Sequence, residues 1–372
     1  MDWYTYSQIL MEKCKKKEIP YHVGFELTPL CNFDCNMCYV HLSPEEVNRE
    51  GKMLTTEQWI HLAEEAKEFG ALTMEITGGE AATRADFPIL FKHFIKMGFL
   101  IVLRTNGYLI KGKLLEIIKQ YKPRLVMVTL YGASDDTYER VCGIKDGFSV
   151  VTKNVLAIKE ANIPIRLSST ITTENINDVQ MMKEWAQKHN LDFSVSGHLF
   201  TPKRGSNRDI VHLQVRYPDE DYMIPEDIKP LKREIADREK YMNPFWMCRT
   251  FGAKCSITWD GKMVLCNSNS SIKKDPLITG FAEAYRGLYK EYKNIQRPEK
   301  CRNCEYIDLC TICPSMMYSS TGSMEETNDN LCKYARRTYK NRYIIGLEKI
   351  ENEEQLVADR CEEGGMIKSN SR

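Results

Sequence analysis

Between residue 21 and about residue 200, short apolar runs rich in β-branched residues alternate with amphipathic stretches of helical period. This alternation is typical of β-α units that build a parallel sheet. Six such units predict an α/β fold, a partial (β/α)6 barrel that is shorter than the eight-fold barrel and open on one side. We expect its strands at 23–28, 72–77, 99–104, 125–130, 164–170 and 191–196.

The first helix of this barrel has recognisable ends. Thr55 and Gln58 have the spacing of a capping box, in which each side chain bonds the backbone N–H of the other residue. Gly70 is expected to end the helix. Its apolar face is formed by Trp59, Leu62, Ala63, Ala66 and Phe69.

Outside the barrel the pattern changes. Residues 201–247 lose the alternation, carry mixed charge and contain several prolines, which is typical of a bridging segment. A cysteine-rich stretch follows, and the C-terminal residues are charged and helix-like between Tyr343 and Asp359. We therefore predict an N-terminal extension at 1–20, the barrel at 21–200, the bridging segment at 201–247, a cysteine-rich domain at 248–335, and a C-terminal helix and tail at 336–372.

The charge balance is neutral. There are 52 basic and 51 acidic residues, giving a formal net charge of +1. No global attraction to nucleic acid or to an anionic membrane is expected. Apolar runs are strand-sized, and the first residues lack a basic region followed by an apolar one, so we expect a cytoplasmic protein without a membrane segment.

The 14 cysteines are unevenly distributed. Three lie between residues 31 and 38 and eight between residues 248 and 332, while Cys14, Cys142 and Cys361 are isolated. The chain is too long for a small disulfide scaffold, so clusters of thiolate metal ligands are the natural interpretation. For the isolated thiols we expect packing or surface roles.

The first group is a C-x3-C-x2-C motif formed by Cys31, Cys35 and Cys38, directly after the first strand. Active sites of barrel folds are built in such loops. Three thiolates hold three corners of a cubane iron–sulfur cluster and leave the fourth iron open to a ligand. The alternatives are a zinc knuckle or a cluster used only for electron storage, although zinc normally takes four protein ligands and no fourth lies nearby.

This motif, followed by the aromatic Tyr39, resembles the cluster-binding loop of the radical S-adenosylmethionine (SAM) superfamily. The resemblance implies that the open iron binds the methionine moiety of SAM and that one electron yields a 5'-deoxyadenosyl radical. Gly78-Gly79-Glu80 follows the second strand, where the family places a Gly-Gly-Glu that contacts the cofactor amino group. Ala81 stands where the family often has proline.

The same resemblance places the ends of the third and fourth strands around the cofactor. Thr105, Asn106 and Thr129 would line its pocket. A cation near Thr129 would hold the cofactor carboxylate, and both Arg140 and Arg166 are candidates. A surface ion pair is the alternative role for each arginine.

The second group contains eight thiols, enough for two four-ligand clusters. Trp259-Asp260-Gly261-Lys262 predicts a hairpin that places Cys266 on a returning strand. A pair of four-cysteine zinc ribbons satisfies the same spacing, as does a single site formed by the four cysteines between 301 and 313. The cysteines are Cys248, Cys255, Cys266, Cys301, Cys304, Cys310, Cys313 and Cys332.

The order of these residues resembles the SPASM extension of radical SAM enzymes, except that two residues rather than three separate Cys310 from Cys313. The resemblance implies three [4Fe-4S] clusters, one that generates the radical and two that are auxiliary. By position, the first auxiliary cluster would be bound by Cys248, Cys255, Cys266 and Cys313, and the second by Cys301, Cys304, Cys310 and Cys332.

Family members with this extension mostly modify ribosomally made peptides. The resemblance therefore implies an oxidoreductase that abstracts hydrogen from a precursor peptide and forms a crosslink, thioether or epimer, with a flavodoxin or ferredoxin-type electron donor. Because only about twenty residues precede the first strand, we expect any leader peptide to be held by a separate protein, by the bridging segment or not at all. Alternatives are a small-molecule dehydrogenase of the superfamily and a non-catalytic electron carrier. A sulfatase-maturase role is disfavoured because Asn267 replaces the aspartate that serves as a base.

Overall fold

The computed structural model describes residues 3–202, 206, 208–215, 237–245, 248, 251–308, 310–333 and 335–336. The chain forms two compact units, one of Met1–Val215 with Cys248–Ile295 and one of Arg216–Met247 with Gln296–Arg372. Most of the bridging segment predicted at 201–247, nearly all of the C-terminal segment predicted at 336–372, and Cys361 lie outside the described residues.

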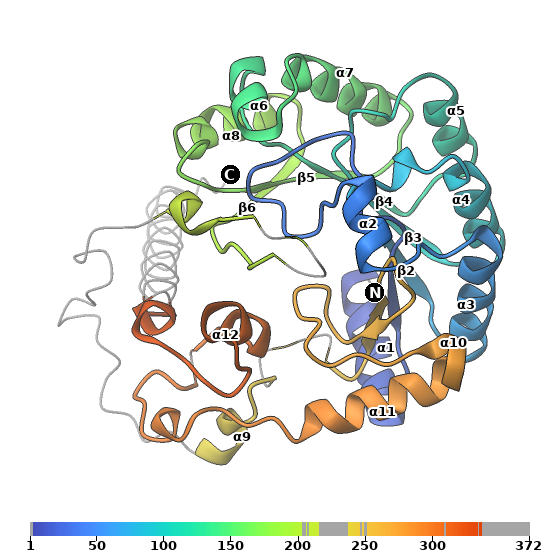
Figure 1. The fold of residues 1–372 in the computed structure, drawn as a ribbon. Helices are drawn as coiled ribbons and strands as arrows, with labels where there is room; N and C mark the ends of the chain where they lie inside the picture. Colours follow the sequence, from blue (N-terminus) through green and yellow to red (C-terminus); the bar gives the residue numbers. More distant parts are fainter. Residues whose placement is uncertain are drawn as a thin grey trace, which may run out of the picture. The chain divides into compact units, whose positions relative to one another are not determined.

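The first unit is built on one eight-stranded sheet in the order β6-β5-β4-β3-β2-β1-β7-β8 (Figure 1). All neighbouring strands are parallel except β7 and β8. The six predicted strands and the α/β class are confirmed. The strands are β1 (His22–Glu26), β2 (Thr73–Thr77), β3 (Leu100–Thr105), β4 (Leu125–Thr129), β5 (Ile165–Thr170), β6 (Asp192–Ser196), β7 (Lys254–Ile257) and β8 (Met263–Val264).

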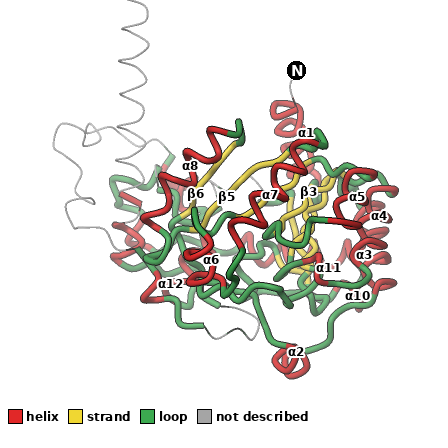
Figure 2. The backbone as a smooth tube through the Cα atoms, turned by 90° about the horizontal axis from the view of Figure 1, so that it is seen from above, coloured by secondary structure: helices red, strands yellow, loops and turns green. Residues whose placement is uncertain are grey.

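Helices connect the parallel strands and lie along the outer side of the curved sheet (Figure 2). The capping box of Thr55 and Gln58 is present at the start of α3, as predicted. Gly70 follows this helix with a positive φ of 109°. The helices are α1 (Trp3–Lys17), α2 (Pro44–Glu50), α3 (Thr56–Glu68), α4 (Phe87–Lys96), α5 (Gly112–Gln120), α6 (Asp135–Cys142), α7 (Gly147–Glu160), α8 (Val179–Lys188), α9 (Arg238–Met242), α10 (Pro276–Thr279), α11 (Phe281–Lys293) and α12 (Pro314–Thr321).

The two faces of β1 have different surroundings. Phe25 is fully buried and packs against Trp59 of α3 and Phe94 of α4, with ring centroids 4.9 and 5.6 Å away. Each such buried aromatic side chain contributes about 1.5–3 kcal/mol to folding. Because side chains alternate along a strand, Gly24 and Glu26 face the opposite side, which is the barrel interior.

The pairing of β7 with β1 differs from the arrangement expected from the sequence. His22 is in register with Lys254, and Val23 with Cys255, so β7 extends the barrel sheet beyond β1. The predicted boundary at 248 therefore does not match the compact units, since residues 248–295 belong to the unit that contains the barrel. The physical reason is that the backbone groups on one edge of β1 find their hydrogen-bond partners in β7.

Among the described residues, no helix is both long enough and apolar enough to cross a membrane.

Candidate functional site

The loop after β1 carries Cys31, Cys35 and Cys38 at the carboxyl end of the sheet. The backbone N–H of Phe33 donates to the Cys31 sulfur at 3.3 Å, and that of His41 donates to the Cys38 sulfur at 3.3 Å. Burial raises the pKa of the Cys31 and Cys38 thiols. Iron binding displaces the thiol proton, so these N–H groups are placed to stabilise the resulting thiolates.

The end of α6 fixes the middle of this loop. The Asp34 N–H donates to the carbonyl of Cys142 at 2.9 Å, and the Asn36 N–H donates to that of Val141 at 3.0 Å. The buried Cys142 thiol lies beside the Cys35 thiol, and its interaction with Cys35 is the largest cause of the raised pKa of Cys35. The sequence predicted only a packing or surface role for Cys142 and did not predict this contact.

Gly78 and Gly79 lie against the backbone that leads into the cysteine loop. The Gly79 N–H donates to the Thr28 carbonyl at 2.7 Å, and the Glu80 N–H donates to the Leu30 carbonyl at 2.9 Å. A Cβ at residue 78 would lie 2.5 Å from the Thr28 oxygen, and one at residue 79 would lie 2.4 Å from the Leu30 oxygen. The two glycines therefore permit the Gly-Gly-Glu loop to pack directly on the cysteine loop.

Glu80 joins this assembly to the end of β3. Its Oε2 accepts hydrogen bonds from Thr105 Oγ1 at 2.9 Å and from the Asn106 N–H at 2.7 Å. Its Oε1 accepts from the Ala82 N–H at 3.1 Å. Burial raises the pKa of Glu80, and these three donors act against that rise. A carboxylate has about four acceptor positions, so one is left for the ammonium expected from the sequence.

Asn106 completes the connection back to the cysteines. Its side-chain amide donates to Asn32 Oδ1 at 2.9 Å and lies 3.7 Å from the Cys31 sulfur. The structure thus brings together Cys31, Glu80, Thr105 and Asn106, which the sequence placed at the ends of three different strands.

Arg208 is a contact of the cysteine loop that sequence reasoning missed. Its Nη1 donates to the Cys35 carbonyl at 3.0 Å, and its guanidinium forms an ion pair with Asp34. The hydrogen bond from Arg208 is the main cause of the lowered pKa of Asp34. The residue lies in the predicted bridging segment, where no pattern marked it.

The two arginines considered for the cofactor carboxylate have different surroundings. Arg140 on α6 donates to the Glu174 carbonyl at 3.0 Å, and its own carbonyl accepts from the Asn36 side chain at 3.0 Å. Arg166 lies two residues before Ser168, which is the register partner of Thr129, and it pairs with exposed Asp192 at 3.6 Å. Arg140 therefore lies beside the cysteine loop, whereas Arg166 lies deeper along the strand.

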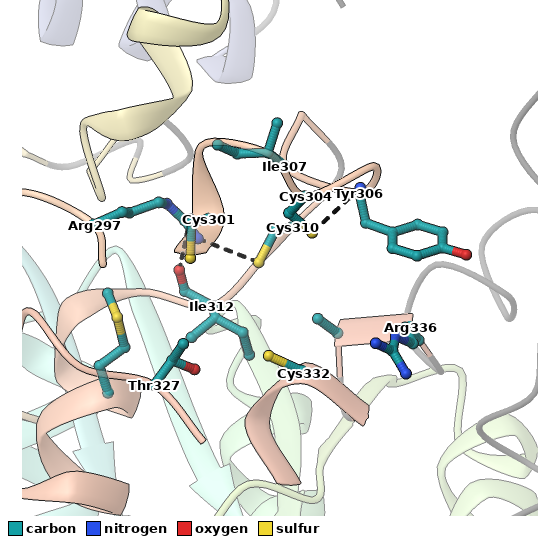
Figure 3. Close-up of a pocket in the computed structure, with 12 residues that line it drawn as sticks. Arg297, Cys301, Cys304, Tyr306, Ile307, Cys310, Ile312, Thr327, Cys332 and Arg336 are labelled. Atoms are coloured by element: carbon teal, nitrogen blue, oxygen red, sulfur yellow. Dashed lines mark hydrogen bonds between the residues drawn. The ribbon is translucent and has the colours of Figure 1, made fainter. Parts of the chain in front are cut away.

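The second unit contains a cavity of about 70 Å³ lined by four thiols (Figure 3). Arg297, Tyr306 and Arg336 also line it, while Cys313 is not among the lining residues. The Tyr306 N–H donates to the Cys304 sulfur at 3.4 Å. Within the described parts of the chain, no three His, Cys, Asp or Glu side chains are arranged to hold a single metal ion. The four thiols are Cys301, Cys304, Cys310 and Cys332.

The remaining cysteines expected at the first auxiliary cluster do not share one environment. Cys248 and Cys266 are half-buried, whereas Cys255 is fully buried on β7. Cys255 is in register with Val23, so its side chain lies on the helix-facing side of the sheet, near Tyr285 of α11. Burial raises the pKa of its thiol. Cys255 therefore does not fit the ligand role that the sequence assigned to it.

Comparison with known proteins identifies the barrel. Residues 25–186 match the family model described as the radical SAM superfamily. This part of the chain is a radical SAM domain. Such a domain binds a [4Fe-4S] cluster and SAM, and the thiols, backbone donors and glycines after β1 and β2 fit these groups.

Several curated proteins share this domain. The chain is 26% identical over 244 residues to the antilisterial bacteriocin subtilosin biosynthesis protein AlbA of Bacillus subtilis (65% of this chain, 52% of the relative). It is 29% identical over 170 residues to PqqA peptide cyclase of Granulibacter bethesdensis (46% and 45%). It is 23% identical over 337 residues to AdoMet-dependent heme synthase of Methanosarcina barkeri (82% and 95%). The chain thus spans about half the length of the first two relatives.

Solved structures share the fold beyond the radical SAM domain. Streptococcus suis SuiB bound to its precursor peptide SuiA superposes with a TM-score of 0.63 at 16% identity, covering 87% of this chain and 79% of SuiB. This similarity concerns the fold, because the sequences have diverged widely.

Proposed function

We propose that this protein is a radical SAM oxidoreductase that abstracts hydrogen from a ribosomally made precursor peptide and oxidatively modifies it. The observation that carries the proposal is the assembly of the cysteine loop, the Gly-Gly-Glu loop and Asn106 at the carboxyl end of one sheet. In this proposal Cys31, Cys35 and Cys38 bind the radical-generating cluster. When bound, this cluster supplies the electron that cleaves SAM to a 5'-deoxyadenosyl radical.

The residues around the cluster would hold SAM in place. Glu80 has an acceptor position left for the cofactor amino group, and Thr105 and Asn106 fix the orientation of its carboxylate. Thr129 lies at the end of the adjacent strand, with Arg140 or Arg166 as the cation for the cofactor carboxylate. We favour Arg140, because its backbone contacts the cysteine loop through Asn36.

Two names among the similar proteins support a peptide substrate. PqqA peptide cyclase is named for a peptide, and SuiB has been crystallised with its precursor peptide. The heme synthase, which aligns over 95% of its length, supports the rival proposal of a small-molecule substrate. Asn267 follows Cys266 and cannot accept a proton at neutral pH, so we do not propose formylglycine formation.

We further propose two auxiliary clusters, which makes three [4Fe-4S] clusters in total. The cavity of the second unit would hold one of them between Cys301, Cys304, Cys310 and Cys332. A cluster is favoured over a single zinc ion because no three of the described His, Cys, Asp or Glu side chains are arranged around one point. For the other cluster, Cys248 and Cys266 remain proposed ligands. A flavodoxin or ferredoxin-type protein would supply electrons, and a separate leader-binding protein remains a proposed partner.

The test is anaerobic reconstitution of the full chain, followed by incubation with SAM, dithionite and short peptides encoded beside its gene. We expect release of 5'-deoxyadenosine and a peptide product that has lost two hydrogens, detected by mass spectrometry. The Cys38→Ala variant provides the control that lacks radical formation. Release of 5'-deoxyadenosine with no change in any peptide, but with oxidation of an alcohol or porphyrin substrate, would replace the peptide proposal with its rival.

A further inference from the structure

Arg297 is a buried cation at the thiol-lined cavity of the second unit. Its side chain points toward the cysteines in Figure 3, and the residue is only 5% exposed. Nη1 donates to the Cys310 sulfur at 3.3 Å, and Nη2 donates to the Ile312 carbonyl at 2.9 Å. One guanidinium therefore bonds both a predicted iron ligand and the backbone two residues further along.

The charge of this guanidinium is not balanced by a carboxylate within the described part of the chain. The ion pairs recorded there do not include Arg297, and its buried Nε has no hydrogen-bond partner. Arginine stays protonated in proteins, and an unpaired buried charge is strongly unfavourable. A site that retains such a group is built for an anionic occupant beside it.

An iron–sulfur cluster bound in the cavity would be this anion. Four thiolates around an iron–sulfur core carry a net negative charge, and reduction by one electron makes that charge larger. A fixed cation in contact with one sulfur stabilises the reduced state more than the oxidised state. This difference is the physical basis of a raised reduction potential.

We propose that Arg297 raises the reduction potential of the cluster held by Cys301, Cys304, Cys310 and Cys332, so that this cluster accepts an electron during substrate oxidation. The inference rests on the proposed function, because it requires an iron–sulfur cluster in the cavity. The substrate radical, which has already given one hydrogen atom to the 5'-deoxyadenosyl radical, would give one electron to the cluster and one proton to solvent, and the four iron–thiolate bonds would stay intact. Arg297 is thus a positioning residue that acts through the cluster and does not touch the substrate.

Two other arginines in the second unit do not share these properties. Arg336 lines the cavity but is exposed, with its guanidinium 6.0 Å from the centre of the Tyr306 ring. Arg238 donates to the carbonyls of Arg302 and Cys304 at 2.8 and 3.1 Å and is only half-buried. Arg238 therefore provides a matched control, since it contacts the same cysteine loop through carbonyl oxygens alone.

The experiment is an anaerobic redox titration of the reconstituted full chain, followed by electron paramagnetic resonance. A parent with Cys31, Cys35 and Cys38 all changed to Ala removes the signal of the radical-generating cluster. In this parent, Arg297→Met should reduce the ratio of reduced to oxidised cluster about tenfold at a fixed potential, a shift of about 59 mV for one electron. Arg297→Gln should give a similar shift, and Arg297→Lys a smaller one, because lysine keeps the charge.

The same redox titration measures the control variant and the results that would overturn the proposal. Arg238→Met should titrate like the parent. Unchanged potentials in Arg297→Met and Arg297→Gln, with iron content retained, would overturn the proposal. Loss of iron from all three Arg297 variants would also overturn it, because Arg297 would then be needed for assembly of the site rather than for its potential.

A separate variant tests the assumption beneath the inference. The double variant Cys301→Ala/Cys304→Ala leaves only two thiols in the cavity and should lower the iron and sulfide content of the protein by about one cluster if the cavity holds one. If this double variant leaves the iron content unchanged, the auxiliary-cluster proposal itself fails. If it loses a cluster while Arg297→Met leaves the potential unchanged, the auxiliary cluster stands and only the role of Arg297 is lost.

Discussion

The cysteine loop after β1 and the thiol-lined cavity of the second unit differ in their number of cysteines and in the groups that donate hydrogen bonds to the sulfur atoms. The loop has three cysteines, and its sulfurs receive hydrogen bonds from the neutral backbone N–H groups of Phe33 and His41. The cavity has four cysteines, and one of its sulfurs receives a hydrogen bond from the buried cation Arg297. In the proposed function, three ligands would leave an iron open for chemistry, whereas four ligands beside a cation would favour storage of an added electron.

The largest effect should come from replacing one cysteine in the cysteine loop and, separately, one in the thiol-lined cavity. Cys38→Ala should abolish release of 5'-deoxyadenosine, a loss of at least about 100-fold, because the reacting iron loses a ligand. Cys310→Ala should keep SAM cleavage but lose the modified product. Chromatography of 5'-deoxyadenosine beside mass spectrometry of the peptide measures both. Continued release from Cys38→Ala would contradict the assignment of the radical site.

The next comparison concerns two thiols of the first unit. Cys255→Val should retain the full iron content, because Cys255 packs on the helix-facing side of β7, where valine has a similar volume. Cys266→Val should lose about one cluster, since this half-buried thiol remains a proposed ligand. Iron and sulfide analysis after reconstitution separates the two. Equal iron loss from both variants would restore Cys255 to the ligand set.

Glu80→Gln should weaken SAM binding by about 10- to 100-fold. The amide keeps the shape of the side chain but loses the charge that accepts bonds from Asn106 and Thr105, each worth about 1.5–3 kcal/mol. Equilibrium dialysis with labelled SAM measures the dissociation constant. Thr105→Val, which removes a single donor, should have a smaller effect, and equal effects in the two variants would argue against a direct cofactor contact by Glu80.

The smallest effect is on stability. Gly79→Ala should lower the free energy of unfolding by about 1–3 kcal/mol, because the new Cβ would lie 2.4 Å from the Leu30 carbonyl oxygen. Gly197→Ala is the control, since nothing lies within 4 Å of a Cβ there. Urea denaturation of the metal-free protein gives both values. If both variants unfold alike, the two loops are less closely packed than described.

Local patterns predicted the barrel well. All six expected strands and the capping box of α3 are present, because alternation and capping are encoded within short stretches of chain. The pairing of β7 with β1 was not predicted, since these strands are separated by more than 200 residues and no local pattern records which edge a strand will join.

The site was predicted less completely. Motif positions identified Cys31, Glu80 and Asn106, but spacing could not show that Glu80 bonds the end of β3. Arg208 and Arg297 had no signal, because an arginine in a polar stretch is usually exposed. The Cys255 side chain lies on the helix-facing side of the sheet. This follows from the alternation of side chains along β7, once that strand is known to pair with β1.

The position of β7 also limits where this protein can be truncated. β1 carries the cysteine loop and has hydrogen-bonded neighbours on both sides, β2 and β7. A shortened chain that stops at residue 247 would leave one side of β1 as an unpaired edge, beside an apolar face that has lost Cys255 and Ile257. Unpaired edges of this kind promote aggregation. The radical SAM domain should therefore be purified with residues 251–295 attached.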